Sequence, residues 1–166
     1  MISDECDRLL NLCRREGLQI VTAESCTGGL IGGALTEIAG SSDVFWGGFI
    51  TYANDAKTRL LDVSPDLLDR CGAVSEEVVR QMALGALDRS GAGLALAVSG
   101  VAGPGGGSDE KPVGTVWIAA ALGKDRALAV QSLFPGDRRS VREATVKYSV
   151  ALAEKLILTH SLLDSE

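Results

Sequence analysis

Residues 18–29 read LQIVTAESCTGG, an apolar run that stops at a short polar, glycine-rich turn. The run is short and partly β-branched, which predicts a buried strand over residues 18–23. Apolar residues return at helical spacing over residues 30–39. A strand, a tight turn and a helix are typical of open α/β sheets, in which ligands bind beyond the carboxyl ends of strands. The turn at residues 24–29 is therefore the first candidate active site.

The rest of the chain divides into further predicted helices and strands around this unit. Periodicity and capping signals predict helices at residues 3–16, from Asn54 onward, at 64–72, at 75–88 and at 138–163, with Ser3, Asn54, Ser64 and Ser75 as expected caps. Apolar runs predict strands at 44–52, 94–98, 113–122 and 127–134. This order predicts a three-layer α/β/α sandwich with a mixed sheet. No repeat, low-complexity tract or linker interrupts it, so we expect one domain over residues 1–166.

The composition narrows the function classes. A formal net charge of −6 argues against wide contact with nucleic acid or with an anionic membrane surface. No apolar run reaches the length that spans a bilayer, and the first residues are acidic where a secretory signal would be basic. The cysteines, at 6, 13, 26 and 71, lack CxxC spacing, and His160 is the only histidine. We therefore expect a cytoplasmic protein without a metal or another cofactor.

The turn itself offers two nucleophiles and a set of backbone donors. Gly28 and Gly29, at the start of a predicted helix, leave amide groups that can hold an anion or the oxyanion of an acyl-transfer intermediate. Ser25 and Cys26 are both possible nucleophiles beside those donors. The same residues equally suit a plain structural role, in which Ser25 or Thr27 caps the helix and the glycines turn the chain.

A hydroxyl nucleophile needs a base, and the sequence has few. His160 lies late in the long terminal helix, so a Ser-His-Asp triad is difficult to build. Lys57 follows a predicted strand, in the segment TYANDAK at residues 51–57. A lysine becomes a base only if burial or a nearby cation lowers its pKa. The alternative is an ordinary solvated lysine on a helix.

A second glycine-rich segment, residues 99–112, also follows a predicted central strand. It lacks the Gly-Lys-Ser/Thr ending of a Walker loop, and no helix follows it as in the dinucleotide fingerprint. It suits close approach of the backbone to a ligand, or it is a flexible surface loop. Arg138, Arg139 and Arg142, at the start of the last helix, could reach a phosphate, although solvated arginines are the more common outcome.

Six blocks of sequence together resemble one known family. They are TAESCTGGL at residues 22–30, TYANDAK at 51–57, GAVS at 72–75, SGVAGP at 99–104, KPVGTV at 111–116 and GDR at 136–138. In this order they closely resemble the CinA C-terminal domain family, over about residues 5–160. The one departure is Ser108-Asp109, where relatives often have Thr-Pro, and it affects only the shape of that loop.

The resemblance implies a three-layer α/β/α fold and an activity. Family members are nicotinamide-nucleotide amidases, which hydrolyse nicotinamide mononucleotide to nicotinate mononucleotide and ammonia. The residues that match the family's catalytic serine, lysine and tyrosine are Ser25, Lys57 and Tyr52. Many relatives also carry a large N-terminal domain with pyrophosphatase activity, which residues 1–166 do not include, and we do not expect that activity here.

On this basis we expect Lys57 to deprotonate Ser25, with Tyr52 assisting proton return to the departing ammonia. The expected substrate-binding residues are Thr27, Gly28 and Gly29 around the oxyanion, Ser99, Gly100, Gly103 and Gly105 around the ribose phosphate, and Asn54 and Arg138. Cys26 ranks second as nucleophile. Two other functions stay open, a regulatory nucleotide-binding module without turnover and an amidase for another small carboxamide. The expected partner is nicotinamide mononucleotide, and a homodimer is the prior for assembly.

Overall fold

The centre of the protein is a five-stranded mixed sheet with the order β2-β1-β3-β4-β5. The computed structural model describes residues 1–163. The strands are β1 (Ile20–Glu24), β2 (Phe45–Ile50), β3 (Leu94–Gly100), β4 (Thr115–Leu122) and β5 (Arg126–Leu133). β1 pairs in parallel with β2 and β3, whereas β4 and β5 continue the sheet in antiparallel fashion. The predicted mixed sheet is confirmed.

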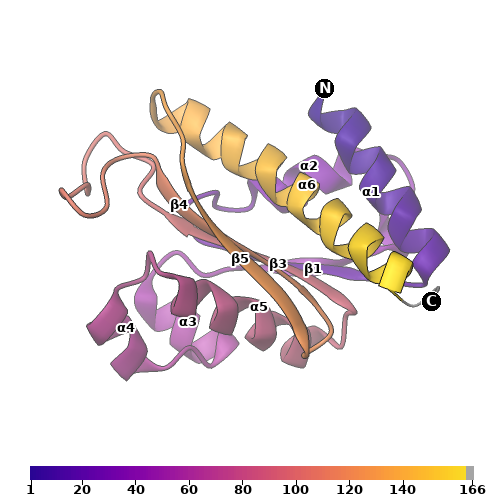
Figure 1. Ribbon diagram of the computed structural model, residues 1–166, viewed down its shortest axis with the longest axis horizontal. Helices are drawn as coiled ribbons and strands as arrows, with labels where there is room; N and C mark the ends of the chain where they lie inside the picture. Colours follow the sequence, from indigo (N-terminus) through magenta and orange to yellow (C-terminus); the bar gives the residue numbers. More distant parts are fainter. Residues whose placement is uncertain (164–166) are drawn as a thin grey trace.

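Helices cover both faces of this sheet (Figure 1). One face carries α1 (Ile2–Glu16), α2 (Leu30–Thr36) and α6 (Arg138–Leu163), and the other carries α3 (Asn54–Leu61), α4 (Pro65–Cys71) and α5 (Glu76–Ser90). A single 3₁₀ turn, η1 (Ser41–Asp43), precedes β2. The three-layer α/β/α prediction is therefore correct. Residues 164–166 of the expected domain lie outside the described residues.

The side-chain alternation of the strands explains why two cores form. On β1, Ile20 joins the core under α1, α2 and α6, whereas Val21 and Ala23 join the core under α3, α4 and α5. All five residues of β1 are buried, as expected for a central strand with a helical layer on each side. Small alanines on β3 and β4 face α5, which allows this helix to pack closely on the sheet.

Several predicted boundaries and caps differ from the structure. The helix predicted over residues 30–39 ends at Thr36. The first helix begins at Ile2 with Met1 as its N-cap, so Ser3 does not cap it. Asn54 is the first residue of α3 rather than its cap. The expected caps of α4 and α5 are confirmed, because Ser64 accepts the amide of Leu67 and Ser75 accepts the amide of Val78.

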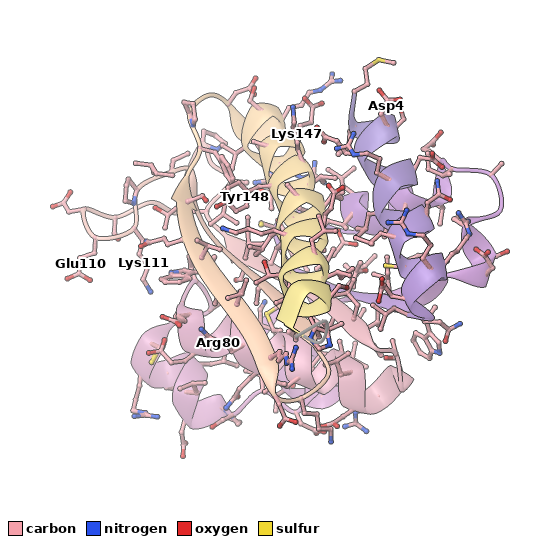
Figure 2. The ribbon with its side chains drawn as sticks, turned by 45° about the vertical axis from the view of Figure 1, so that its right-hand side comes forward. Asp4, Arg80, Glu110, Lys111, Lys147 and Tyr148 are labelled. Atoms are coloured by element: carbon pink, nitrogen blue, oxygen red, sulfur yellow. The ribbon has the colours of Figure 1, made fainter. Side chains whose placement is uncertain are left out.

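The parallel strands bring three segments to one edge of the sheet. Glu24, the last residue of β1, is in register with Ile50 on β2 and with Val98 on β3. The residues that follow these strands therefore meet at the carboxyl edge. Beyond the same edge the chain between β3 and β4 projects from the body, and Figure 2 shows Glu110 and Lys111 on this projection. None of the helices in the described part of the chain has the length and apolar character that crossing a bilayer requires.

Candidate active site

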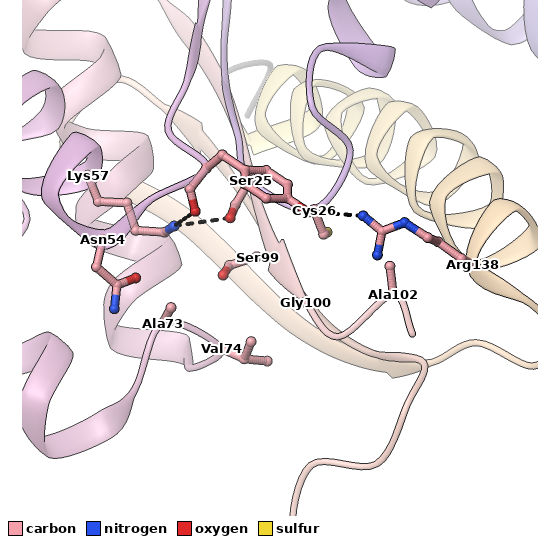
Figure 3. A pocket seen from close by; sticks show the side chains of 11 residues that line it. Ser25, Cys26, Asn54, Lys57, Ala73, Val74, Ser99, Gly100, Ala102 and Arg138 are labelled. Atoms are coloured by element: carbon pink, nitrogen blue, oxygen red, sulfur yellow. Dashed lines mark hydrogen bonds between the residues drawn. The ribbon is translucent and has the colours of Figure 1, made fainter. Parts of the chain in front are cut away.

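Ser25 and Lys57 are in direct contact at the carboxyl edge of the sheet. Ser25 follows β1, and its amide donates to the carbonyl oxygen of Val98 on β3, which fixes its backbone. Lys57 lies near the start of α3, and its Nζ is 3.0 Å from Ser25 Oγ (Figure 3). This spacing allows proton transfer between the hydroxyl and the amine.

Lys57 is buried and has no carboxylate partner within residues 1–163. Its side chain is 1% exposed, and Nζ also donates to the carbonyl oxygens of Thr51 at 2.8 Å and Tyr52 at 3.4 Å. Burial lowers the pKa of Lys57 from 10.5 to about 8, because an ammonium ion loses hydration inside the protein. A sizeable fraction of Lys57 is therefore the neutral amine near pH 7.5. This is the condition that the sequence analysis set for a lysine base.

The pair lines a cavity of about 210 Å³. Its lining combines four loops, the end of β3 and parts of α3 and α6: Ser25, Cys26, Tyr52, Asn54, Lys57, Ala73, Val74, Ser99, Gly100, Ala102 and Arg138. Seven of the expected site residues are thus brought together: Ser25, Tyr52, Asn54, Lys57, Ser99, Gly100 and Arg138. In the described part of the chain, no group of three His, Cys, Asp or Glu side chains is arranged to hold a metal ion.

Tyr52 is positioned differently from the proton relay that the sequence analysis expected. Its ring is 61% exposed, and its hydroxyl accepts a hydrogen bond from Arg138 at 2.9 Å. Lys57 contacts the backbone carbonyl of Tyr52 rather than its hydroxyl. Arg138 also donates to the carbonyl oxygen of Gly103. Tyr52 and Arg138 therefore link α3's leading loop to the start of α6 at the rim of the cavity.

The glycines of the Ser25 turn (residues 25–29) do not line the cavity, contrary to expectation. The Gly28 amide donates to the Ser25 carbonyl oxygen, and Thr27 is fully buried with its hydroxyl donating to Glu24 at 2.7 Å. Thr27, Gly28 and Gly29 are absent from the cavity lining. Their expected contact with the substrate is therefore not supported, because internal hydrogen bonds hold the turn against the protein.

Helix α2 is capped by a carboxylate rather than by Ser25 or Thr27. Glu24 accepts the amides of Ile31 at 2.8 Å and Gly32 at 3.0 Å. Acidic groups stabilise helix N-termini, where unpaired amides and the helix dipole favour negative charge. The plain structural role that the sequence left open for Ser25 is thus filled by Glu24.

Cys26 lines the cavity beside Ser25, but its thiol is not activated. Burial is the main cause that raises the pKa of Cys26 to about 11. A thiol with such a pKa stays protonated near neutral pH, and the thiolate is the nucleophilic form. The Cys26 amide lies toward its own sulfur, and no other residue within 1–163 accepts its hydrogen. Of the two candidate nucleophiles, Ser25 alone contacts a buried amine.

The glycine loop (residues 101–114, between β3 and β4) contributes less to the cavity than expected. Gly103 and Gly105 do not line it. Gly103 is buried with its carbonyl oxygen on Arg138, and Gly105 is exposed with no atom within 4 Å of a Cβ built on it. A second, open cavity of about 650 Å³ shares Ala102 and Arg138 with the first and is lined further by Pro104, Val113, Gly136, Asp137, Arg139 and Arg142.

The residues that hold the Ser25 turn in place were not predicted from the sequence. Glu24 had no expected role, although an acidic residue between a buried strand and two glycines is a usable signal for a buried helix cap. Arg142 was expected as a possible phosphate ligand, whereas it donates to the carbonyl oxygens of Cys26 and Thr27 at 3.1 and 3.0 Å. Ala73 and Val74 form part of the cavity wall without having been singled out as binding residues.

Comparison with known proteins identifies the family of this chain. The model of the CinA C-terminal domain matches residues 4–157. The chain belongs to the CinA C-terminal domain family. A competence/damage inducible protein from Agrobacterium tumefaciens, whose crystal structure is known, superposes on this CinA C-terminal domain with a TM-score of 0.91 and 47% identity, covering 93% of this chain and 94% of that one.

Two relatives by sequence differ in length. A protein named nicotinamide-nucleotide amidohydrolase PncC, from Enterobacter agglomerans, is 54% identical over 141 residues, which make up 84% of this chain and 85% of that protein. A CinA-like protein from Akkermansia muciniphila is 52% identical over 137 residues, 82% of this chain but 33% of that protein. The CinA C-terminal domain thus occurs both nearly alone and as one third of a longer chain. The family that the six sequence blocks resemble is confirmed.

Proposed function

We propose that this protein is an amidase that hydrolyses nicotinamide mononucleotide to nicotinate mononucleotide and ammonia. The single observation that carries the proposal is the 3.0 Å contact between Ser25 Oγ and the buried Nζ of Lys57 inside a cavity. A hydroxyl beside a neutral amine is an activated nucleophile, and acyl transfer is the chemistry that it performs. The high identity to a relative named nicotinamide-nucleotide amidohydrolase supports the choice of substrate.

The first half of the reaction is acylation of Ser25. Neutral Lys57 takes the proton of Ser25 Oγ, and Oγ forms a bond to the carboxamide carbon. As the carbon–nitrogen bond of the tetrahedral intermediate breaks, the Lys57 ammonium returns its proton to the leaving nitrogen, and ammonia departs. In the second half, Lys57 takes a proton from water, and the resulting hydroxide adds to the ester carbonyl carbon. As the ester bond to Oγ breaks, the Lys57 ammonium returns its proton to Ser25 Oγ, and nicotinate mononucleotide departs.

The developing oxyanion needs hydrogen-bond donors, and the Cys26 amide suits this role best. It belongs to the residue after the nucleophile, it borders the cavity, and no other described residue accepts its hydrogen. The Ser25 amide is unsuitable, because it already donates to Val98. One such donor is typically worth about 3 kcal/mol of transition-state stabilisation.

The nicotinamide ring fits the small cavity, with the carboxamide toward Ser25. Ala73, Val74 and the Tyr52 ring supply apolar and aromatic walls, and an aromatic face attracts a cationic pyridinium ring. Asn54 and the Ser99 hydroxyl border the same space and can bond the carboxamide. Tyr52 thereby acts on the substrate ring rather than as the proton relay.

The ribose phosphate must leave this cavity, because about 210 Å³ is below the roughly 300–1,000 Å³ of sites that enclose small ligands. We place the ribose phosphate in the adjoining cavity at the start of α6, because Arg138 borders both cavities. Asp137, which also lines it, is engaged by the amide and hydroxyl of Ser140. We therefore assign the phosphate to Arg138 rather than to the amides of the glycine loop. Arginine binds phosphate through paired, charge-assisted hydrogen bonds.

A substrate panel tests this function. Purified protein is incubated with nicotinamide mononucleotide, nicotinamide riboside and NAD, and ammonia is measured. Release from the mononucleotide alone is the expected result. Equal release from the riboside would indicate an amidase for other carboxamides. Binding without release would indicate a regulatory nucleotide-binding module, and either outcome would refute the proposal.

The cellular setting follows from the same proposal. We propose a cytoplasmic protein, and the four cysteines, all of them free, suit a reducing compartment. The homodimer expected from the sequence stays a prediction.

A further inference from the structure

Two charged side chains of opposite sign hold the Ser25 turn, and neither lines the cavity next to Ser25. They are Glu24, directly before the nucleophile, and Arg142, on α6 and 116 residues away from Cys26. Glu24 accepts hydrogen bonds from donors of the turn and of α2, and Arg142 donates hydrogen bonds to carbonyl oxygens of the turn.

Glu24 is buried and binds four donors. Its exposed fraction is 1%. Oε1 accepts the Thr27 hydroxyl at 2.7 Å and the Ile31 amide at 2.8 Å, and Oε2 accepts the Thr22 hydroxyl and the Gly32 amide at 3.1 and 3.0 Å. No Lys or Arg within residues 1–163 forms an ion pair with it. A buried carboxylate with a full set of hydrogen bonds and no counter-ion is held in one orientation by them.

The Arg142 side chain binds main-chain carbonyl oxygens of the same turn. Nε donates to the Cys26 carbonyl oxygen at 3.1 Å, and one terminal nitrogen donates to the Thr27 carbonyl oxygen at 3.0 Å. Hydrogen bonds from a charged donor are roughly twice as strong as neutral ones. These two carbonyl groups belong to the Cys26–Thr27 and Thr27–Gly28 peptide units, which directly follow the unit that carries the Cys26 amide. Arg142 therefore fixes the orientation of both.

We infer that Glu24 and Arg142 are positioning residues that keep Ser25 Oγ and the Cys26 amide in their reactive geometry. Together they engage the Cys26 carbonyl and both the carbonyl and the hydroxyl of Thr27, which leaves the turn little freedom to rotate. Displacing a reacting group by about 1 Å costs on the order of 100-fold in rate. The inference rests on the proposed function only for the identity of the substrate.

Arg142 therefore differs in role from Arg138, although the two lie one helical turn apart. Both arginines line the adjoining cavity, but only Arg138 also reaches the small cavity and Tyr52. Two nitrogens of Arg142 donate to carbonyl oxygens of the Ser25 turn. A substrate-binding arginine affects mainly KM, and a positioning arginine affects mainly kcat. The split between kcat and KM thus separates the two assignments.

The main test is Arg142→Met, with Arg80→Met as matched control. Arg80 on α5 (Figure 2) also donates to a main-chain carbonyl oxygen, that of Ala127. Ala127 pairs with Ala121 near the opposite end of the sheet from Ser25. We expect Arg142→Met to lower kcat on the order of 100-fold, with KM changed by less than about threefold. Millimolar guanidinium should restore part of kcat, which a purely structural loss would not allow. Arg80→Met should keep the wild-type kcat.

Two results would overturn the assignment of Arg142. One is a rise in KM at unchanged kcat, which would make it a substrate-binding residue. The other is a kcat equal to that of the Arg80 control.

Glu24 is tested by Glu24→Gln and Thr27→Val. Glutamine places an NH₂ group against one of the two α2 amides, and we expect kcat to fall about 10- to 100-fold. Should this variant fail to fold, Thr27→Val removes a single hydrogen bond to Oε1 and keeps the side-chain shape, and kcat should still fall several-fold at constant KM. A wild-type kcat in Thr27→Val would refute the role of Glu24.

A covalent probe separates this inference from the proposed function. A fluorophosphonate reacts with an activated serine by forming an oxygen–phosphorus bond and expelling fluoride, and mass spectrometry then measures the modification rate of Ser25. We expect the rate to fall in Arg142→Met by about the same factor as kcat. If the wild type reacts quickly yet releases no ammonia from the mononucleotide, the proposed substrate is wrong, and the probe still decides whether Arg142 positions Ser25. Equal probe rates in both proteins would overturn the inference.

Discussion

Two glycine-rich segments follow the neighbouring parallel strands β1 and β3, and they are built in opposite ways. The Ser25 turn runs directly into α2 and is bonded internally by Glu24 and Arg142. The glycine loop projects from the sheet, with residues 104–110 all exposed. It is anchored to other elements by Arg138 on the Gly103 carbonyl and by Lys111 on the Cys71 carbonyl. The Ser25 turn is thus glycine-rich and rigid, whereas the glycine loop is glycine-rich and exposed. The hydrogen bonds from Glu24 and Arg142 to the Ser25 turn account for this difference.

The largest expected effect lies on the side of the Ser25 turn. Lys57→Met removes the base that contacts Ser25, so we expect ammonia release to fall on the order of 10⁴-fold or more. The matched control in the other segment is Lys111→Met, which removes a half-buried lysine contact to a carbonyl oxygen and should change turnover by less than about threefold.

The same base predicts the pH dependence of the wild type. Because the neutral amine is the active form and its pKa is about 8, kcat/KM should rise with pH and level off above that value. A rate that is flat from pH 6 to pH 9 would contradict a lysine base.

Lys57→Met also probes the energetic cost of the buried amine. The pKa is about 8 in the folded protein and 10.5 in an unfolded chain, so the unfolded state binds more protons between these values. Lys57 therefore destabilises the fold below pH 8, and the free energy of unfolding should rise from pH 8 to pH 10.5 by up to about 3 kcal/mol on its account. Denaturant titrations across this range should show the rise in the wild type and lose it in Lys57→Met. Parallel curves for the two proteins would mean that Lys57 is not desolvated.

Arg138 tests the connection between the two segments. Arg138→Ala removes the proposed phosphate ligand and the anchor of Gly103, so KM for nicotinamide mononucleotide should rise about 10- to 100-fold, as expected for a lost hydrogen bond to a charged group. The rate at which a fluorophosphonate modifies Ser25, which does not depend on the ribose phosphate, serves as internal control and should change much less. An equal loss in both measurements would mean that Arg138 does not recognise the phosphate.

The smallest expected effects compare one glycine from each segment. Gly29 has a φ of +103°, and a Cβ built there would lie 3.1 Å from Ile50 Cδ1. Gly29→Ala should therefore strain the Ser25 turn and lower kcat several-fold, since side chains disfavour this backbone region. Gly105→Ala meets no atom within 4 Å and should leave kcat within about twofold. Equal effects of the two substitutions would remove the distinction between a rigid and a permissive segment.

Much of the architecture could be predicted from the sequence, because it depends on local patterns. The buried strand before Ser25, the long final helix and the mixed sheet follow from apolar periodicity and from the order of the elements. Ser25 and Lys57 could be named as candidates because both follow strands whose carboxyl ends meet at one edge of the sheet. Their roles as nucleophile and base were implied by the resemblance to the CinA C-terminal domain family. The pKa shift of Lys57 could only be stated as a condition, since burial depends on the packing of α3.

The missing parts depend on contacts between distant residues. The amides of Thr27, Gly28 and Gly29 were expected in the cavity, but the turn bonds to Glu24 and to itself instead. The sequence placed Arg142 with Arg138 and Arg139 as possible phosphate ligands, and the GDR block singled out only Arg138. The contact of Arg142 with the turn depends on the course of α6, which the sequence does not show. The prediction that Asn54 caps α3 was also wrong. Ala53 is the N-cap of this helix, and Asn54, its first residue, borders the cavity.

The central claim is that Ser25, and not the adjacent Cys26, is the nucleophile. The most direct measurement is ammonia release from nicotinamide mononucleotide by Ser25→Ala and Cys26→Ala, with folding verified by thermal unfolding. We predict that Ser25→Ala loses turnover on the order of 10⁴-fold or more, whereas Cys26→Ala keeps it within about threefold, because the buried Cys26 thiol has a pKa of about 11. Near-normal turnover in Ser25→Ala, or its loss only in Cys26→Ala, would contradict the account.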